Sequence, residues 1–210
     1  GINAEYGEQP TVMVKLLLQG DFNAGKSSTL RSYCDKTYLQ ANPALHLSAQ
    51  PDFRTVQVQK TVDNQPVNLK LQIVDLIGQQ RFQNILQAYF KSASGVLFLF
   101  DTTSRASFDG LRNHVHQLQM HAENAAVKFV VVGTKTDLQR AVPLEECIQL
   151  AAELGAGYSE LSNFSGDGVD RSFDLLLDEI MASQDFQDKL TQAQLAAVTQ
   201  QVLQDKKRCL

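Results

Sequence analysis

The chain has 210 residues, of which 43% are hydrophobic and 20% are charged. This length fits one α/β domain with a tail better than two packed domains, and the composition excludes bulk disorder. The net charge of −4 leaves no excess of cations for phosphates, which excludes nucleic acid as the main partner. The three cysteines, Cys34, Cys147 and Cys209, form neither a disulfide framework nor a zinc pattern, which favours a reducing, cytoplasmic compartment.

Neither a signal peptide nor a membrane span is expected. Gly1–Pro10 is polar and lacks the apolar core of a signal peptide. The longest apolar runs, Val96–Phe100 and Phe129–Val132, are far shorter than the roughly 20 residues that cross a bilayer.

Short apolar runs alternate with helix-like spacings along the chain. In chain order they predict a strand Val12–Leu18, a helix Ser27–Tyr38, strands Thr55–Thr61 and Val67–Asp75, a helix Phe82–Ser92, a strand Gly95–Phe100, a helix Arg105–Ala122, a strand Val127–Gly133, a helix Leu144–Leu154, a strand Gly157–Leu161 and a helix Val169–Ser183. This order favours a three-layer α/β/α fold with a mostly parallel six-stranded sheet covered on both faces. Such sheets bind ligands at the carboxyl ends of their strands.

The pattern divides the chain into a polar segment 1–11, a domain 12–183 and a tail 184–210. Within the tail, Asp185–Gln204 can form an amphipathic helix. Its candidate apolar positions are Phe186, Leu190, Ala197 and Val198. Because six glutamines occur from Gln187 onward, the tail is expected to be mobile and to lie outside the core.

The strongest local signal is GDFNAGKS at residues 20–27, between a predicted strand and a predicted helix. It matches G-x-x-x-x-G-K-[ST], the pattern of a phosphate-binding P-loop. Backbone N–H groups of such a loop and the helix dipole hold phosphate oxygens. Lys26 then places a charge on the β and γ phosphates, and the Ser27 hydroxyl can bind Mg²⁺. The residues expected at the phosphates are Gly20, Asn23, Ala24, Gly25, Lys26, Ser27 and Ser28.

A second motif, D-x-x-G-Q, begins at the end of a predicted strand. Asp75 there can hold Mg²⁺, the Gly78 backbone N–H can meet a γ phosphate, and Gln79 can orient the attacking water. The motif therefore indicates hydrolysis of a nucleoside triphosphate.

A third motif, Thr134-Lys135-Thr136-Asp137, follows another buried strand. A carboxylate at Asp137 can accept two parallel hydrogen bonds from the N1–H and the amino group of guanine. Adenine lacks that donor pair, so Asp137 favours guanine and disfavours an ATP-using P-loop enzyme.

Together these motifs resemble those of small GTPases and, among them, the Rab family. The segments that carry the likeness are Lys15–Leu18 with Gly20-Asp21, Leu69–Ile73 with Asp75, Gly78-Gln79 with Arg81-Phe82, and Phe100–Thr103 with Ser107-Phe108. The likeness runs from Val12 to about Ser183, about four-fifths of the chain. It implies a P-loop switch in vesicle traffic that binds GTP or GDP with Mg²⁺ and hydrolyses GTP with Gln79 and Lys26.

The resemblance also assigns further roles. Ser48 stands where the family uses a Thr that closes on Mg²⁺ and the γ phosphate. The implied metal ligands are Ser27, Ser48 and Asp75. Tyr38 stands where the family places an aromatic residue against the guanine edge, and the stem of Lys135 would cover the base. Ser162 and Asn163 resemble the final base-binding loop, in which a backbone N–H meets the guanine oxygen.

Several residues depart from the family pattern. Phe22 replaces a small residue, and a phenyl ring there would crowd the γ phosphate and an incoming arginine finger. Thr134 replaces an Asn that bonds the base and braces the P-loop. Asn163 and Phe164 replace a small residue and a Lys, and Val74 replaces a common aromatic residue. These departures keep open an alternative class, a nucleotide-binding scaffold with little or no hydrolysis.

Partner and membrane contacts are also implied. Rab proteins meet exchange factors, GTPase activators and effectors through their switch regions. The candidate contact residues, for which core burial is the other interpretation, are Phe53, Leu76, Ile77, Phe82 and Tyr89. Lys206–Arg208 could attract anionic lipid, and Cys209 is either a lipid attachment site, which would make the protein peripheral on the cytosolic face of an organelle membrane, or part of a solvated end.

The remaining candidate groups are given structural interpretations. His114 and His121 share one face of a predicted helix, and a solvated face is preferred to a metal site because no Cys or carboxylate pattern completes one. Cys34 and Cys147 lie in helical patterns and are expected to be packing residues.

Overall fold

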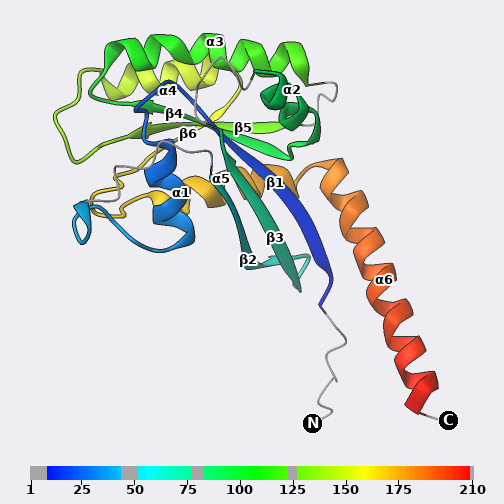
Figure 1. Ribbon diagram of the computed structural model, residues 1–210. Coiled ribbons are helices and arrows are strands. Elements are labelled where there is room, and N and C mark those ends of the chain that lie inside the picture. Colours follow the sequence, from blue (N-terminus) through cyan, green and yellow to red (C-terminus); the bar gives the residue numbers. More distant parts are fainter. Residues whose placement is uncertain (1–8, 44–51, 77–82, 123–126, 209–210) are drawn as a thin grey trace.

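The computed structural model describes residues 9–43, 52–76, 83–122 and 127–208, in which six strands form one sheet of order β2-β3-β1-β4-β5-β6 (Figure 1). The strands are β1 Thr11–Gln19, β2 Asp52–Val62, β3 Gln65–Asp75, β4 Gly95–Asp101, β5 Lys128–Thr134 and β6 Gly157–Glu160. The helices are α1 Lys26–Cys34, α2 Gln83–Ser92, α3 Arg105–His121, α4 Leu144–Glu153, α5 Val169–Met181 and α6 Gln184–Arg208. Neighbouring strands are parallel except β2 and β3, which confirms the predicted fold class.

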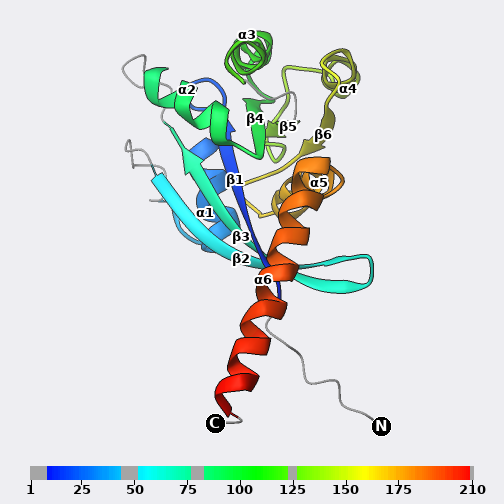
Figure 2. The ribbon, with the colours of Figure 1, turned by 90° about the vertical axis from the view of Figure 1, so that its right-hand side faces the viewer.

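The two faces of the sheet bury separate hydrophobic clusters because strand side chains alternate between faces. Leu16 and Leu18 pack into the cluster that contains residues of α1, α5 and α6. Leu17, between them, packs into the cluster that contains residues of α2, α3 and α4. Figure 2 shows these two helical layers on opposite sides of the sheet. Helices therefore cover both faces, as predicted.

The antiparallel pair β2 and β3 is a tight hairpin. Val62 pairs with Gln65, and the two residues between them, Asp63 and Asn64, have φ angles of 50° and 62°. Asp and Asn tolerate this left-handed backbone, which a two-residue hairpin turn requires. The polar turn expected between the two strands is confirmed, and both strands are longer than predicted.

The first helix is shorter than the predicted Ser27–Tyr38. It ends at Cys34, the Asp35 N–H caps the Arg31 carbonyl, and Lys36 adopts a left-handed φ of 52°. Because a helix cannot continue through a left-handed residue, Tyr38 lies in the following loop.

The long helix α6 begins in the core and extends away from the body of the protein (Figures 1 and 2). Phe186 and Leu190 are buried against the α1–α5 side of the sheet, whereas Leu195 and Val198 are more than 60% exposed. The expectation that this segment lies outside the core is thus wrong for its first two turns. In the described part of the chain, no helix combines the length and apolarity needed to span a bilayer.

Leu190→Ala is expected to lower the free energy of unfolding by about 2 kcal/mol, because it removes buried methyl groups and leaves a cavity. Leu195→Ala is the matched control on the same helix, since that side chain is 64% exposed and its loss changes stability by about 0.5 kcal/mol or less. Urea unfolding of both variants measures the difference. Equal midpoints would contradict the packing of α6 against the core.

Candidate functional site

The P-loop connects the carboxyl end of β1 to the amino end of α1 and depends on its two motif glycines. A Cβ at Gly20 would lie 2.1 Å from the Leu99 carbonyl oxygen, so no side chain fits there. Gly25 has a left-handed φ of 92°, and Asn23 one of 65°. Ala24, which is part of the loop, is fully buried. The predicted order of strand, loop and helix is confirmed.

Lys26 is the first residue of α1 and is buried under the loop. Its Nζ donates hydrogen bonds to the carbonyl oxygens of Gly20 and Asp21, at 2.8 and 2.7 Å. Burial lowers the pKa of Lys26, and the nearby carboxylates of Asp75 and Asp21 raise it by less. The P-loop thus holds a partly desolvated cation among its own carbonyl groups.

Ser27 and Asp75 meet beside Lys26. Asp75 is fully buried at the end of β3, opposite Leu18 of β1, and the Ser27 hydroxyl donates to its carboxylate. Within the described ranges, no cluster of three His, Cys, Asp or Glu side chains forms a metal cage. A hydroxyl and a carboxylate are hard oxygen ligands, which Mg²⁺ takes in small number together with phosphate oxygens and water. These two residues therefore fit Mg²⁺.

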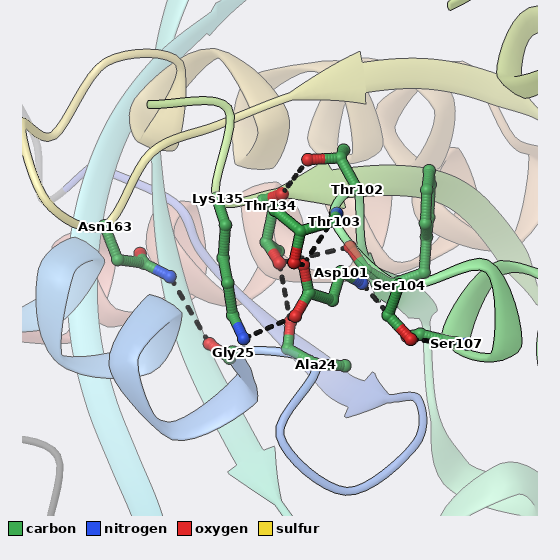
Figure 3. A network of polar contacts seen from close by, with 11 residues as sticks. Ala24, Gly25, Asp101, Thr102, Thr103, Ser104, Ser107, Thr134, Lys135 and Asn163 are labelled. Atoms are coloured by element: carbon green, nitrogen blue, oxygen red, sulfur yellow. Dashed lines mark hydrogen bonds and ion pairs between the residues drawn. The ribbon is translucent and has the colours of Figure 1, made fainter. Parts of the chain in front are cut away.

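The predicted base-binding residues gather beyond β5 and β6. The Ser162 hydroxyl donates to the Asp137 carboxylate at 2.6 Å, which leaves the second carboxylate oxygen for other donors. Lys135, with a left-handed φ of 60°, pairs its Nζ with Asp101 at 2.5 Å (Figure 3). Burial raises the pKa of Asp101, but hydrogen bonds from Lys135 and Thr103 outweigh it, so the pKa lies below its ordinary value. The pair fixes the Lys135 stem at the end of β5.

Thr134 still braces the P-loop although it lacks an amide. Its hydroxyl lies 2.8 Å from the Ala24 carbonyl oxygen and 3.1 Å from that of Phe100. This contact joins the end of β5 to the P-loop (Figure 3). Thr134 therefore keeps one contact with the loop at the position where the family has an Asn.

Tyr38 lies against the loop that follows β6. The N–H of the next residue, Leu39, donates to the Asn163 carbonyl oxygen at 2.9 Å. A Cβ at Gly166 would approach the Tyr38 ring to 2.6 Å, so only glycine admits the ring. The aromatic residue predicted at the base edge is therefore placed beside the final predicted base-binding loop.

Sequence reasoning missed a contact between the P-loop and α3. His114 Nε2 lies 2.6 Å from Asp21 Oδ1, and its Nδ1 lies 3.3 Å from the Gln19 side chain. A Cβ at Gly110 would come within 2.6 Å of the same Asp21 carboxylate. The prediction that His114 belongs to a solvated helix face is therefore wrong. No sequence signal reveals the contact, because its partners lie 93 residues apart.

Some predicted residues are exposed, and others lie outside the described ranges. Phe22 is 84% exposed at the tip of the P-loop, where its ring packs on no core. Ser28 lies half-buried in the first turn of α1. The predicted residues outside the described ranges are Ser48, Ile77, Gly78, Gln79, Phe82 and Cys209.

The candidate partner residues divide between core and surface. Leu76 is buried in the core cluster with α2, α3 and α4, which contradicts its interpretation as a contact residue. Phe53 is 51% exposed, and Tyr89 is half-buried. Both line a cavity of about 170 Å³ together with Lys15, Gln72 and Val74. Val74 thus leaves space at the position where an aromatic residue is common.

A P-loop at the end of β1, a buried strand-end carboxylate and an Asp137 carboxylate beyond β5 together define a P-loop nucleotide-binding protein. Residues 15–182 match the sequence model of the Ras family. Ras-related protein Rab-27A of Rattus norvegicus is 36% identical over 177 residues, which are 80% of this chain and 79% of that protein. Ras-related protein RABE1e of Arabidopsis thaliana is 32% identical over 191 residues, which are 90% of this chain and 81% of that protein.

The chain belongs to the Ras family and is a Rab-like small GTPase. It is a GTP-binding and GTP-hydrolysing switch of the kind that regulates vesicle traffic, and its ligands are GTP or GDP with Mg²⁺. The predicted family, fold, activity and ligands are confirmed. The comparisons do not favour the alternative of a scaffold without hydrolysis.

Proposed function

We propose that this Rab-like switch holds its nucleotide through the residues placed above. Lys26 and the backbone of the P-loop bind the phosphates, Ser27 and Asp75 hold Mg²⁺, and Asp137 binds the guanine edge. When bound, Mg²⁺ neutralises charge on the β and γ phosphate oxygens. The observation that carries this proposal is that the ends of three strands, β1, β3 and β5, bring these groups to one edge of the sheet.

The switching step rests on residues outside the described ranges. Ser48 and Gly78 would contact the γ phosphate, and loss of that contact after hydrolysis releases their segments. Gln79 would orient the attacking water while Lys26 stabilises the charge that develops on the phosphate. Exchange factors, activators and effectors would bind the segments that contain Ser48 and Gly78, and Phe53 and Tyr89 would lie at the border of that binding surface.

The tail would connect the switch to a membrane. From Leu190 to Arg208, α6 adds about 27 Å beyond the core at 1.5 Å per residue. Lys206 and Lys207 are exposed at its far end, where each cation contributes about 1 kcal/mol of attraction to anionic lipid. Lipidation of Cys209 would add the second signal that stable anchoring needs. The protein is then cytoplasmic and peripheral on the cytosolic face of an organelle membrane.

Phe22 is proposed to slow hydrolysis, because its exposed ring stands on the P-loop at the position where the family resemblance implies crowding of the γ phosphate, Gln79 and an incoming arginine finger. Phe22→Ser is expected to raise the single-turnover rate of GTP hydrolysis several-fold, measured as phosphate release from GTP-loaded protein with Mg²⁺. Phe164→Ser is the control, since it makes the same change on an exposed side chain of the base loop. An unchanged rate in Phe22→Ser would refute the role of the ring.

A further inference from the structure

Two side chains from different loops converge on the same glycine of the P-loop. A Cβ built on Gly25 lies 3.3 Å from Thr134 Oγ1 and 3.4 Å from Asn163 Nδ2. The first side chain comes from the end of β5 and the second from the loop after β6 (Figure 3). Both are buried, Thr134 completely and Asn163 to 5% exposure. The two positions therefore share one small polar site behind the P-loop.

Each of the two side chains holds a different carbonyl group. The Thr134 hydroxyl reaches the Ala24 carbonyl oxygen. Asn163 Nδ2 lies 3.4 Å from the Gly25 carbonyl oxygen and 2.9 Å from Thr29 Oγ1 in the first turn of α1. A hydroxyl has one hydrogen to donate, whereas an amide nitrogen has two. The amide can therefore serve the loop and the helix at once, which Thr134 cannot.

Among the described groups, the side chain of Asn163 forms hydrogen bonds through its nitrogen alone. Its Oδ1 is buried, and no described group donates a hydrogen bond to it. A buried acceptor without a donor is unfavourable, so a small apolar side chain would fill this space at lower cost if packing were its only purpose. The amide is therefore explained by what its nitrogen holds, namely the Gly25 carbonyl and the Thr29 hydroxyl.

The Gly25 carbonyl group lies at the junction between the P-loop and α1. Its carbonyl oxygen also accepts the Thr29 N–H at 2.9 Å, the first hydrogen bond of α1. Fixing this carbonyl fixes the direction of the neighbouring N–H groups that face phosphate oxygens. The loop after β6, which contains Asn163, also contains Ser162, whose hydroxyl donates to Asp137. Asn163 thus links the base-binding loop to the P-loop by one side chain.

We propose that Asn163 is a positioning residue for the nucleotide. It supplies from the base loop the amide that position 134 lacks, and through it Gly25 and Thr29 keep the P-loop in its phosphate-binding form. This proposal rests on the guanine-nucleotide site proposed above. The affinity for GDP then depends on Asn163 and Thr134 jointly.

The test is a mutational exchange in the full chain, read as the dissociation rate of a fluorescent GDP analogue in the presence of Mg²⁺. Asn163→Ala is expected to speed dissociation about tenfold, the effect of losing one or two buried hydrogen bonds. Thr134→Asn combined with Asn163→Ala is expected to return the rate to within about threefold of the wild type, because the longer amide enters the space that Asn163 vacates. Thr29→Val, which keeps the shape but removes the hydroxyl, is expected to speed dissociation two- to fivefold.

Three results separate the possible failures. If Asn163→Ala dissociates at the wild-type rate, or if the exchange gives no rescue, Asn163 has no positioning role. A side chain that only stabilises the fold would lower the melting temperature, and an amide at position 134 would not restore the dissociation rate. If the wild type itself retains no guanine nucleotide, the proposed function fails instead.

Discussion

Lys26→Met is expected to weaken the binding of GDP and GTP by at least about a hundredfold. Hydrogen bonds from a charged donor to phosphate are worth about 1.5–3 kcal/mol each, and Lys26 supplies more than one in the proposed complex. About 1.4 kcal/mol corresponds to a tenfold change in affinity. Isothermal titration with GDP, or competition against a fluorescent analogue, measures the loss.

The folded state should tolerate this substitution. Lys26 is 6% exposed, and in the described ranges its Nζ donates hydrogen bonds to loop carbonyl groups. Methionine has a similar length and no charge to desolvate, which offsets part of the loss of these two hydrogen bonds, so the unfolding free energy is expected to fall by about 1–3 kcal/mol. Lys36→Met is the matched control, because Lys36 forms an exposed ion pair with Asp170 away from the P-loop. Equal nucleotide affinity in both variants would contradict the role of Lys26.

The same residue predicts a pH dependence of nucleotide affinity. Burial lowers the pKa of Lys26, and a bound phosphate favours its charged form, so nucleotide binding is expected to raise the pKa. Binding therefore takes up a proton at pH values above the lowered pKa, and affinity falls as the pH rises through it. Titrations at increasing pH should show this alkaline decline in the wild type and not in Lys26→Met. An identical profile in both would assign the decline to another group.

Contiguous motifs made the fold and the P-loop predictable from sequence. Gly20, Gly25 and Lys26 lie within seven positions, and the geometry they need is set locally by a strand, a turn and a helix. The alternation of buried strands with amphipathic helices fixed the order of the layers in the same way. Short-range patterns thus carry the information whenever the interacting atoms are close in sequence.

Contacts between distant segments were not predictable. Nothing near His114 indicates that its imidazole reaches Asp21, and nothing near Asn163 indicates that its amide reaches Gly25, which is 138 positions away. Phe186 and Leu190 are recognisable as apolar positions of α6, but the glutamine-rich composition gives no sign that they pack in the core, on a surface formed by other elements. In each case the two contacting segments become neighbours only in the folded protein.

This limit also applies to the departures at the nucleotide site, which the sequence presents one residue at a time. Considered alone, Thr134 lacks the amide that the family has at this position. The fold places an amide from another position, Asn163, against the Gly25 carbonyl, next to the Ala24 carbonyl that Thr134 contacts. Substitutions at positions that share one site have to be read together, because coupled neighbours are not additive.

Asp137→Asn is expected to lower GDP affinity by about a hundredfold or more and to remove the preference for the 2-amino group of the base. The carboxylate can accept from N1–H and from the amino group at once, and each charge-assisted bond is worth about 1.5–3 kcal/mol. An asparagine of the same shape has one acceptor oxygen, and its NH₂ group would face the N–H donors of guanine unfavourably. It still accepts the Ser162 hydroxyl through its oxygen, so the local fold is preserved.

Inosine diphosphate, which lacks the 2-amino group, provides an internal measure of this contact. The wild type is expected to bind GDP about tenfold or more tightly than inosine diphosphate, since the analogue loses one of the two bonds. In Asp137→Asn the ratio should approach one. Ser162→Ala is the control, because it removes only the hydroxyl that orients Asp137 and should weaken both ligands while keeping most of their ratio. A ratio that persists in Asp137→Asn would place recognition of the amino group on another residue.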